Sequence, residues 1–218
     1  MATWMIHLRI ADKLLDRIPG LSPIEFIMGN MAPDSGVPNK DWTQFFPSKL
    51  ISHFREDDGT GKKKINLDAY LRQYFTPALR ESYHERQYAF YLGYYTHLLT
   101  DCLWSDRIAW PTRLRFPDVS WEDIKEDWYD LDFLFLKKRP GFRAFRAYLG
   151  SVGFVNTYMD SFAPDAFDNR RENITSFYLQ ENNNLNREYP YLTEAEADEF
   201  VDAAVEEILS ALGNLHGR

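Results

Sequence analysis

The sequence predicts an all-α protein built from several helices, and three observations lead to this fold class. Apolar residues recur at intervals of three and four along most of the chain, which is the spacing of a helix with one buried face. Residues that cap or break helices stand at the ends of several of these stretches. No convincing alternation with a period of two, the pattern of a half-buried strand, occurs anywhere.

Length and composition indicate one folded unit. The 218 residues suit one domain, and the 44% hydrophobic content is close to that of an ordinary globular protein. Aromatic residues make up 16% of the chain, so rings can fill the space between packed helices. We therefore expect residues 1–218 to form a single helical domain.

The first third of the chain predicts four helices. Apolar spacing indicates a helix over residues 4–18, which the Pro-Gly pair at 19–20 ends, and a short helix that opens at Ser22. The prolines and glycine within 32–39 predict an irregular loop. A third helix is expected over 45–54, followed by an exposed charged loop at 57–64, and Asn66 is a candidate cap for a fourth helix.

Three helices are predicted in the second half. They cover residues 120–138, 142–155 and 193–212. The last one opens with Thr193 and Glu196, the spacing at which two side chains reciprocally cap the first turn of a helix. We expect residues 111–218 to complete the helical core.

Charge and cysteine content exclude several classes of protein. The net charge of −8 disfavours binding to the phosphate backbone of nucleic acids. The lone Cys102 forms no internal disulfide and excludes a cysteine-rich zinc site. The sequence shows no signal peptide pattern and no apolar run of the roughly 20 residues that span a bilayer, so we expect a cytoplasmic protein. Its oligomeric state is not indicated.

The segment 80–104 contains the most informative pair of residues. From Tyr88 onward it is apolar or aromatic on nearly all sides, which indicates a buried helix, yet it carries His97 and Asp101. Residues four apart lie on one face of a helix, so both side chains can reach one ion. A buried carboxylate is costly without compensation, and either a divalent metal or a buried Arg with His97 as partner would provide it.

Three further residues raise the case for a metal. His7 and His53 adjoin apolar positions of predicted helices, and Asp34 lies in a Pro-Asp-Ser-Gly turn. Each pattern alone is typical of ordinary structure. Together with the helical pair they provide the nitrogen and oxygen ligands that zinc prefers, with iron and manganese as lesser options. We expect the metal site to lie within residues 1–110.

The ordered set of these five residues resembles the zinc-dependent phospholipase C family, which is related in fold to the P1-type nucleases. The likeness lies in segments 24–34 (IEFIMGNMAPD), 52–54 (SHF) and 91–101 (YLGYYTHLLTD). The resemblance implies an all-helical fold and hydrolysis of phosphodiesters or phospholipid headgroups at a zinc cluster. It implies that one zinc is bound by Asp34, His53, His97 and Asp101, with His7 at a neighbouring metal position.

The chain departs from this family after Asp101. The family has further histidines there and a downstream His-x-x-x-Glu pair, whereas this sequence has no histidine between His97 and His216. We therefore expect one zinc ion, or two with Asp106 as an additional ligand, in place of a three-zinc cluster.

The leading hypothesis is a zinc-dependent phosphoesterase that acts on a small phosphorylated or phospholipid-headgroup substrate. Asp34 would be a ligand or the general base for the attacking water. Arg107, or the lysines at 62–64, would offset charge in the transition state, and Trp104, close to the metal pair, would form a wall of the cleft.

Three alternatives remain. An HD-type phosphohydrolase is also helical, but the chain contains no His-Asp dipeptide. The missing downstream ligands favour a non-catalytic, metal-stabilised binding protein over a fully active enzyme. The simplest hypothesis is a helical domain that binds no metal.

Overall fold

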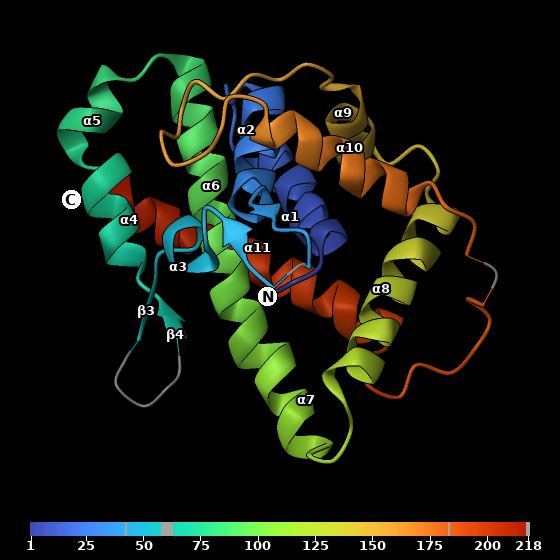
Figure 1. Cartoon of the computed structure of the whole chain (residues 1–218). Helices are drawn as coiled ribbons and strands as arrows, with labels where there is room; N and C mark the ends of the chain where they lie inside the picture. The colour runs from blue at the N-terminus through green and yellow to red at the C-terminus, as the bar shows by residue number, and fades with distance from the viewer. Residues whose placement is uncertain (42, 58–62, 183, 217–218) are drawn as a thin grey trace.

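The computed structural model describes residues 1–41, 43–57, 63–182 and 184–216, and it is mainly helical (Figure 1). Its elements are α1 (Trp4–Arg17), α2 (Pro23–Met31), η1 (Ala32–Asp34), β1 (Val37–Pro38), β2 (Phe45–Phe46), α3 (Lys49–Ser52), β3 (Arg55–Asp57), β4 (Lys63–Ile65), α4 (Leu67–Tyr74), α5 (Pro77–Ser82), α6 (Glu85–Trp104), η2 (Ser105–Ala109), α7 (Trp110–Arg115), α8 (Trp121–Lys138), α9 (Arg143–Gly150), α10 (Ala166–Tyr178) and α11 (Glu194–His216). The all-α prediction is confirmed.

Most of the predicted helices are present, and the caps expected at Asn66 and Thr193 are made, whereas the Ser22 side chain makes no capping bond at the start of α2. The Asn66 side chain accepts a hydrogen bond from the amide of Ala69 at the start of α4. At α11, the Thr193 hydroxyl accepts from the Glu196 amide, and the Glu196 carboxylate accepts from the Thr193 amide. These reciprocal bonds satisfy amides that the first turn of a helix leaves without partners.

Two predicted helices are too long, and three helices were missed. The helix expected over 45–54 begins only at Lys49, because Pro47 disfavours helical geometry at the preceding residue, and Phe45–Phe46 instead form strand β2. The helix expected over 142–155 ends at Gly150. Helices α5, α7 and α10 were not predicted; α5 and α7 are short segments, and α10 is mostly polar, so none of them shows a clear apolar stripe.

Two antiparallel hairpins interrupt the helices. Strand β1 pairs with β2, and β3 pairs with β4 with Arg55 opposite Ile65. The charged segment expected as a loop at 57–64 therefore includes the ends of a hairpin. Residues 58–62 lie outside the described residues, as does the side chain of Lys63, while Lys64 is exposed on β4.

The close contact between α2 and α6 positions the site (Figure 1). A Cβ atom on Gly29 would lie 2.0 Å from the Phe90 carbonyl oxygen, and one on Gly93 would lie 2.1 Å from that of Phe26. Two glycines thus let the helix backbones touch. The Asn30 amide on α2 also donates to the Thr96 hydroxyl on α6 at 3.0 Å.

Buried apolar residues from both halves of the chain belong to one hydrophobic cluster, which includes Leu14, Phe26, Tyr94, Trp104, Tyr148 and Ile208. In the described part of the chain, no helix has the length and apolar character that a membrane crossing requires.

Candidate metal centre

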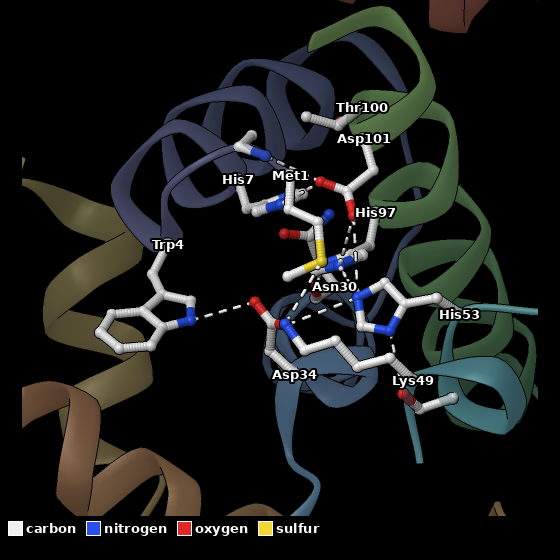
Figure 2. Close-up of polar contacts among 12 residues, drawn as sticks. Met1, Trp4, His7, Asn30, Asp34, Lys49, His53, His97, Thr100 and Asp101 are labelled. Atoms are coloured by element: carbon white, nitrogen blue, oxygen red, sulfur yellow. Dashed lines mark hydrogen bonds and ion pairs between the residues drawn. The ribbon is translucent and has the colours of Figure 1, made fainter. Parts of the chain in front are cut away.

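Five polar side chains from four elements point into one small volume (Figure 2). His7 lies on α1, Asp34 at the end of η1, and His53 directly after α3, while His97 and Asp101 both lie on α6. All five are buried, and the three histidines have no solvent-exposed surface. The structure therefore brings together all five residues that the resemblance named as ligands.

His97 lies at the middle of this group, which we call the His-Asp cluster. Its Nε2 atom is 3.4 Å from His53 Nε2 and 3.8 Å from Asp101 Oδ2. His53 Nε2 in turn lies 3.4 Å from Asp34 Oδ1 and 3.7 Å from Asp101 Oδ2. Ligands about 2.0–2.2 Å from a shared tetrahedral zinc ion are separated by similar distances.

His7 completes a second group around the same centre. Its ring stacks on that of His97 with centroids 3.8 Å apart, and its Nε2 atom lies 3.4 Å from Asp101 Oδ1. The potential ligand atoms of His7, His97 and Asp101 lie within 4.8 Å of one another, and those of Asp34, His53 and His97 do so as well. His97 belongs to both groups, so the residues offer either one site or two adjacent ones.

Several buried polar atoms of the cluster lack hydrogen bonds. Among the described residues, neither ring nitrogen of His7 nor Oδ2 of Asp101 has a hydrogen-bond partner. A buried polar atom without a partner costs free energy, and native structures contain few of them. A divalent cation would satisfy Asp101 Oδ2 and one ring nitrogen of His7, and nitrogen and carboxylate donors are the ligands that zinc binds, so the residues present fit a metal ion.

A second layer of hydrogen bonds orients the cluster side chains. The His97 ring bonds the Asn30 carbonyl through Nδ1 at 2.7 Å, and Ser52 Oγ lies 2.9 Å from His53 Nδ1. The Trp4 indole donates to Asp34 Oδ2 at 3.0 Å. Both imidazoles thereby turn Nε2 toward the centre, the arrangement that outer hydrogen bonds produce in metal sites.

Electrostatics keep the carboxylates ionised and His97 neutral. Burial alone would raise the pKa of Asp34 and of Asp101, but the neighbouring His53 and Lys49 for the former, and His7 and His97 for the latter, hold each pKa below its usual value. Burial, followed by the neighbouring His7, lowers the pKa of His97 well below its usual value. Ionised carboxylates and neutral imidazoles are the forms that bind metals.

A cleft of about 440 Å³ reaches the cluster at Asp34. It is lined by Met1, Ala2, Trp4, Asp34, Lys49, Arg55, Ala109, Trp121, Lys125, Trp128, Tyr129 and Arg170. Lys49 Nζ lies 3.9 Å from Asp34 Oδ1, and Arg170 Nε donates to the Asp34 carbonyl at 2.5 Å. The cleft thus connects the solvent with the Asp34 carboxylate of the cluster. Its lining is rich in basic and aromatic side chains.

The two residues predicted to bind substrate lie elsewhere. Arg107 is exposed and pairs with Glu207 of α11, outside the cleft lining. Trp104 is completely buried against Trp128 and Phe200, because its side of α6 faces the core. Neither side chain lines this cleft, and Trp104 contacts the cleft residue Trp128.

Asp106, considered as an additional ligand, is exposed on η2 and belongs to neither group of potential ligands in the described chain. Sequence reasoning also missed Asn30, Trp4, Lys49 and Arg170. Asn30 did leave a signal, since it is a polar residue within an apolar helical stretch. Arg170 left none, because it meets Asp34 across 136 positions of sequence.

Comparison with known proteins gives one match. Residues 6–104 match the family model described as zinc dependent phospholipase C, which covers somewhat less than half of the chain. No curated protein and no solved structure matches significantly. The matched segment contains all five cluster side chains. Residues 6–104 of this chain are thus similar to the zinc-dependent phospholipase C family, the family that the sequence analysis named.

Proposed function

We propose that this protein is a zinc-dependent phosphoesterase that hydrolyses phosphodiester or phospholipid-headgroup substrates. One observation carries the proposal: five buried imidazole and carboxylate groups converge within a segment that matches the zinc-dependent phospholipase C family. His7, Asp34, His53, His97 and Asp101 would hold one or two zinc ions. A bound zinc ion lowers the pKa of a coordinated water toward about 7 and polarises a phosphoryl oxygen.

The remaining chemistry falls to the chain's own residues. Asp34 is the cluster residue that lines the cleft, so it would be a metal ligand or the general base for the attacking water, and its lowered pKa favours the ligand role. Lys49 lies next to that carboxylate and is positioned to hold a phosphoryl oxygen of the substrate. The Trp4 indole fixes the orientation of Asp34.

Metal removal tests this proposal. Purified protein is stripped with a chelator, and hydrolysis of a chromogenic phosphodiester is followed before and after zinc is restored. We expect activity to disappear and return with zinc, and elemental analysis to find one or two zinc ions per chain. No hydrolysis of phosphomonoesters or phosphodiesters by fully zinc-loaded protein would contradict the proposal.

The burial of the cluster favours a second candidate, a metal site that only stabilises the fold. His7, His53 and His97 are fully buried, and Asp101 is 2% exposed. Structural zinc sites are closed by four protein ligands, whereas catalytic sites keep a position for water. X-ray absorption spectroscopy of the zinc-loaded protein separates the two: four protein ligands support the structural role, and an additional water oxygen supports catalysis.

A further inference from the structure

The lining of the cleft carries a strong excess of positive charge. Lys49, Arg55, Lys125 and Arg170 line it, while Asp34 is the only carboxylate among the lining residues that the structure describes. These cations come from α3, β3, α8 and α10, so four separate segments converge. In a chain with a net charge of −8, this local reversal of sign marks a site for an anion.

Most of these cations have no carboxylate partner in the part of the chain that the structure describes. Across the described ranges, no acidic side chain forms an ion pair with Arg55, Lys125 or Arg170. The Nε atom of Arg55 is buried without a hydrogen-bond partner. Lys49 faces Asp34 at 3.9 Å, and a metal at the cluster would compete for that carboxylate. The cleft therefore holds more positive charge than one phosphodiester anion balances.

The aromatic residues of the cleft do not offer an open cage for a cationic headgroup. A quaternary ammonium group binds over the faces of aromatic rings. The Arg170 guanidinium already lies 5.4 Å from the Trp4 ring centre, and that of Arg113 lies 4.3 Å from the Trp121 ring centre. Trp128 is almost completely buried. Guanidinium groups thus occupy one face of each of two rings and repel a further cation.

We propose that this cleft selects phosphoesters with a second anionic group and discriminates against esters that carry a cationic group such as choline. The inference rests on the proposed phosphoesterase function and specifies its substrate class. The reacting phosphate lies at the His-Asp cluster, and the surplus cations of the cleft wall bind the second negative charge. Anionic phospholipid headgroups and water-soluble anionic phosphoesters share this chemistry.

A matched substrate series tests the selectivity on the zinc-loaded protein. Three p-nitrophenyl phosphodiesters share the leaving group and differ only in a second ester group: anionic carboxyethyl, neutral ethyl, or cationic choline. We expect kcat/KM to fall in that order, by about tenfold or more from anionic to cationic, since a charge-assisted hydrogen bond contributes at least that factor. An equal or higher value for the choline ester would overturn the inference and leave the proposed function intact.

Variants assign the selectivity to the cleft. Lys125 is exposed on α8, so Lys125→Glu is compatible with folding, and it is expected to remove most of the anionic preference. Lys137→Glu changes an exposed lysine of the same helix outside the cleft and serves as the control, with unchanged preference. If both variants keep the preference of the unmodified protein, the cleft wall does not select the substrate and the inference fails.

A binding measurement keeps the test independent of turnover. Titration of the zinc-loaded protein with inorganic phosphate and with choline chloride, followed by tryptophan fluorescence, is expected to show saturable binding of phosphate and none of choline. If no ester is hydrolysed, the proposed function fails, but this titration still tests the charge selectivity. Binding of choline in preference to phosphate would contradict the proposed selectivity.

Vesicles distinguish the two sources of anionic phosphoester. Faster hydrolysis of phosphatidylglycerol vesicles than of phosphatidylcholine vesicles would assign lipid headgroups as the substrate. An anionic preference seen only with water-soluble esters would assign free phosphoesters.

Discussion

The His-Asp cluster and the wall of the cleft come from different parts of the chain and differ in character. The cluster side chains lie between residues 7 and 101, within the family match, and none of their residues is more than 5% exposed. Much of the cleft wall lies beyond that match, from Ala109 to Arg170, and includes side chains such as Trp121, which is 40% exposed. Metal binding needs a fixed set of ligands, whereas substrate selection occurs at a surface, and Asp34 belongs to both regions and joins them.

The largest expected effect comes from His97→Ala, which removes the residue shared by both ligand groups. Since losing an outer partner of a metal ligand already costs roughly 10–100-fold in affinity or activity, we expect zinc to be lost and hydrolysis to fall by at least that factor. Elemental analysis and the phosphodiester assay measure both. Circular dichroism serves as the folding control. A folded variant with full zinc content and full activity would show that the His-Asp cluster is not the metal site required for hydrolysis.

The next prediction concerns the connection between the two regions. Asp132 on α8 accepts hydrogen bonds from the Thr3 hydroxyl and the Tyr178 hydroxyl, so it joins the start of α1 to α10. Burial, only partly offset by these two bonds, raises its pKa from 3.8 to about 7. The folded protein therefore holds this proton more tightly than the unfolded chain, and stability decreases as the pH rises from about 4 to about 7.

Asp132→Asn removes this titration. The free energy of unfolding of the unmodified protein is expected to fall, relative to that of the variant, by up to about 4 kcal/mol across this pH window. Urea denaturation at several pH values gives both curves. Parallel curves for the two proteins would show that folding does not raise the pKa of Asp132 and would contradict this prediction.

The contact between α2 and α6 gives a third prediction. In Gly29→Ala the new Cβ would lie 2.0 Å from a backbone oxygen of Phe90, so the helices must separate. We expect a loss of about 3 kcal/mol of unfolding free energy and weaker zinc binding, because Asp34 follows α2 in the chain. Gly141→Ala is the control, as nothing lies within 4 Å of its Cβ position. Equal stability of the two variants would mean that the close helix contact is not required.

The smallest expected effect is that of Trp4→Phe, which keeps a ring but removes the hydrogen bond to Asp34 Oδ2. Loss of such an outer bond is expected to weaken zinc affinity about tenfold. Competition with a chromophoric chelator measures the zinc affinity. Trp110→Phe is the control, because Trp110 lies on α7 and is not part of the cleft lining. Unchanged affinity in Trp4→Phe would place Asp34 outside the metal site.

Local spacing made part of the site predictable from the sequence. His97 and Asp101 are four apart on a helix, and helical geometry alone places them on one face. His7, Asp34 and His53 lie on separate elements, so only the resemblance to a known family indicated that they meet. The cleft cations could not be foreseen, because Lys49 lies on a separate helix from Asp34 and Arg170 meets Asp34 from a distant segment, so tertiary packing alone brings them together.

The same reasoning explains the errors in the fold. Capping residues such as Asn66 and Thr193 predicted helix starts correctly, because their bonds lie within one turn. The helix expected over 45–54 was wrong in its first half, where apolar spacing outweighed the effect of Pro47. The organisation of residues 1–218 as a single domain stays a prediction.

Diffraction from crystals grown with zinc, recorded at the zinc absorption edge, tests the central claim most directly. We predict an anomalous peak within about 2.0–2.2 Å of His97 Nε2, with Asp101 and at least one of His7, His53 and Asp34 in bonding contact. Fully occupied zinc elsewhere in the crystal, with no peak at His97, would contradict the claim.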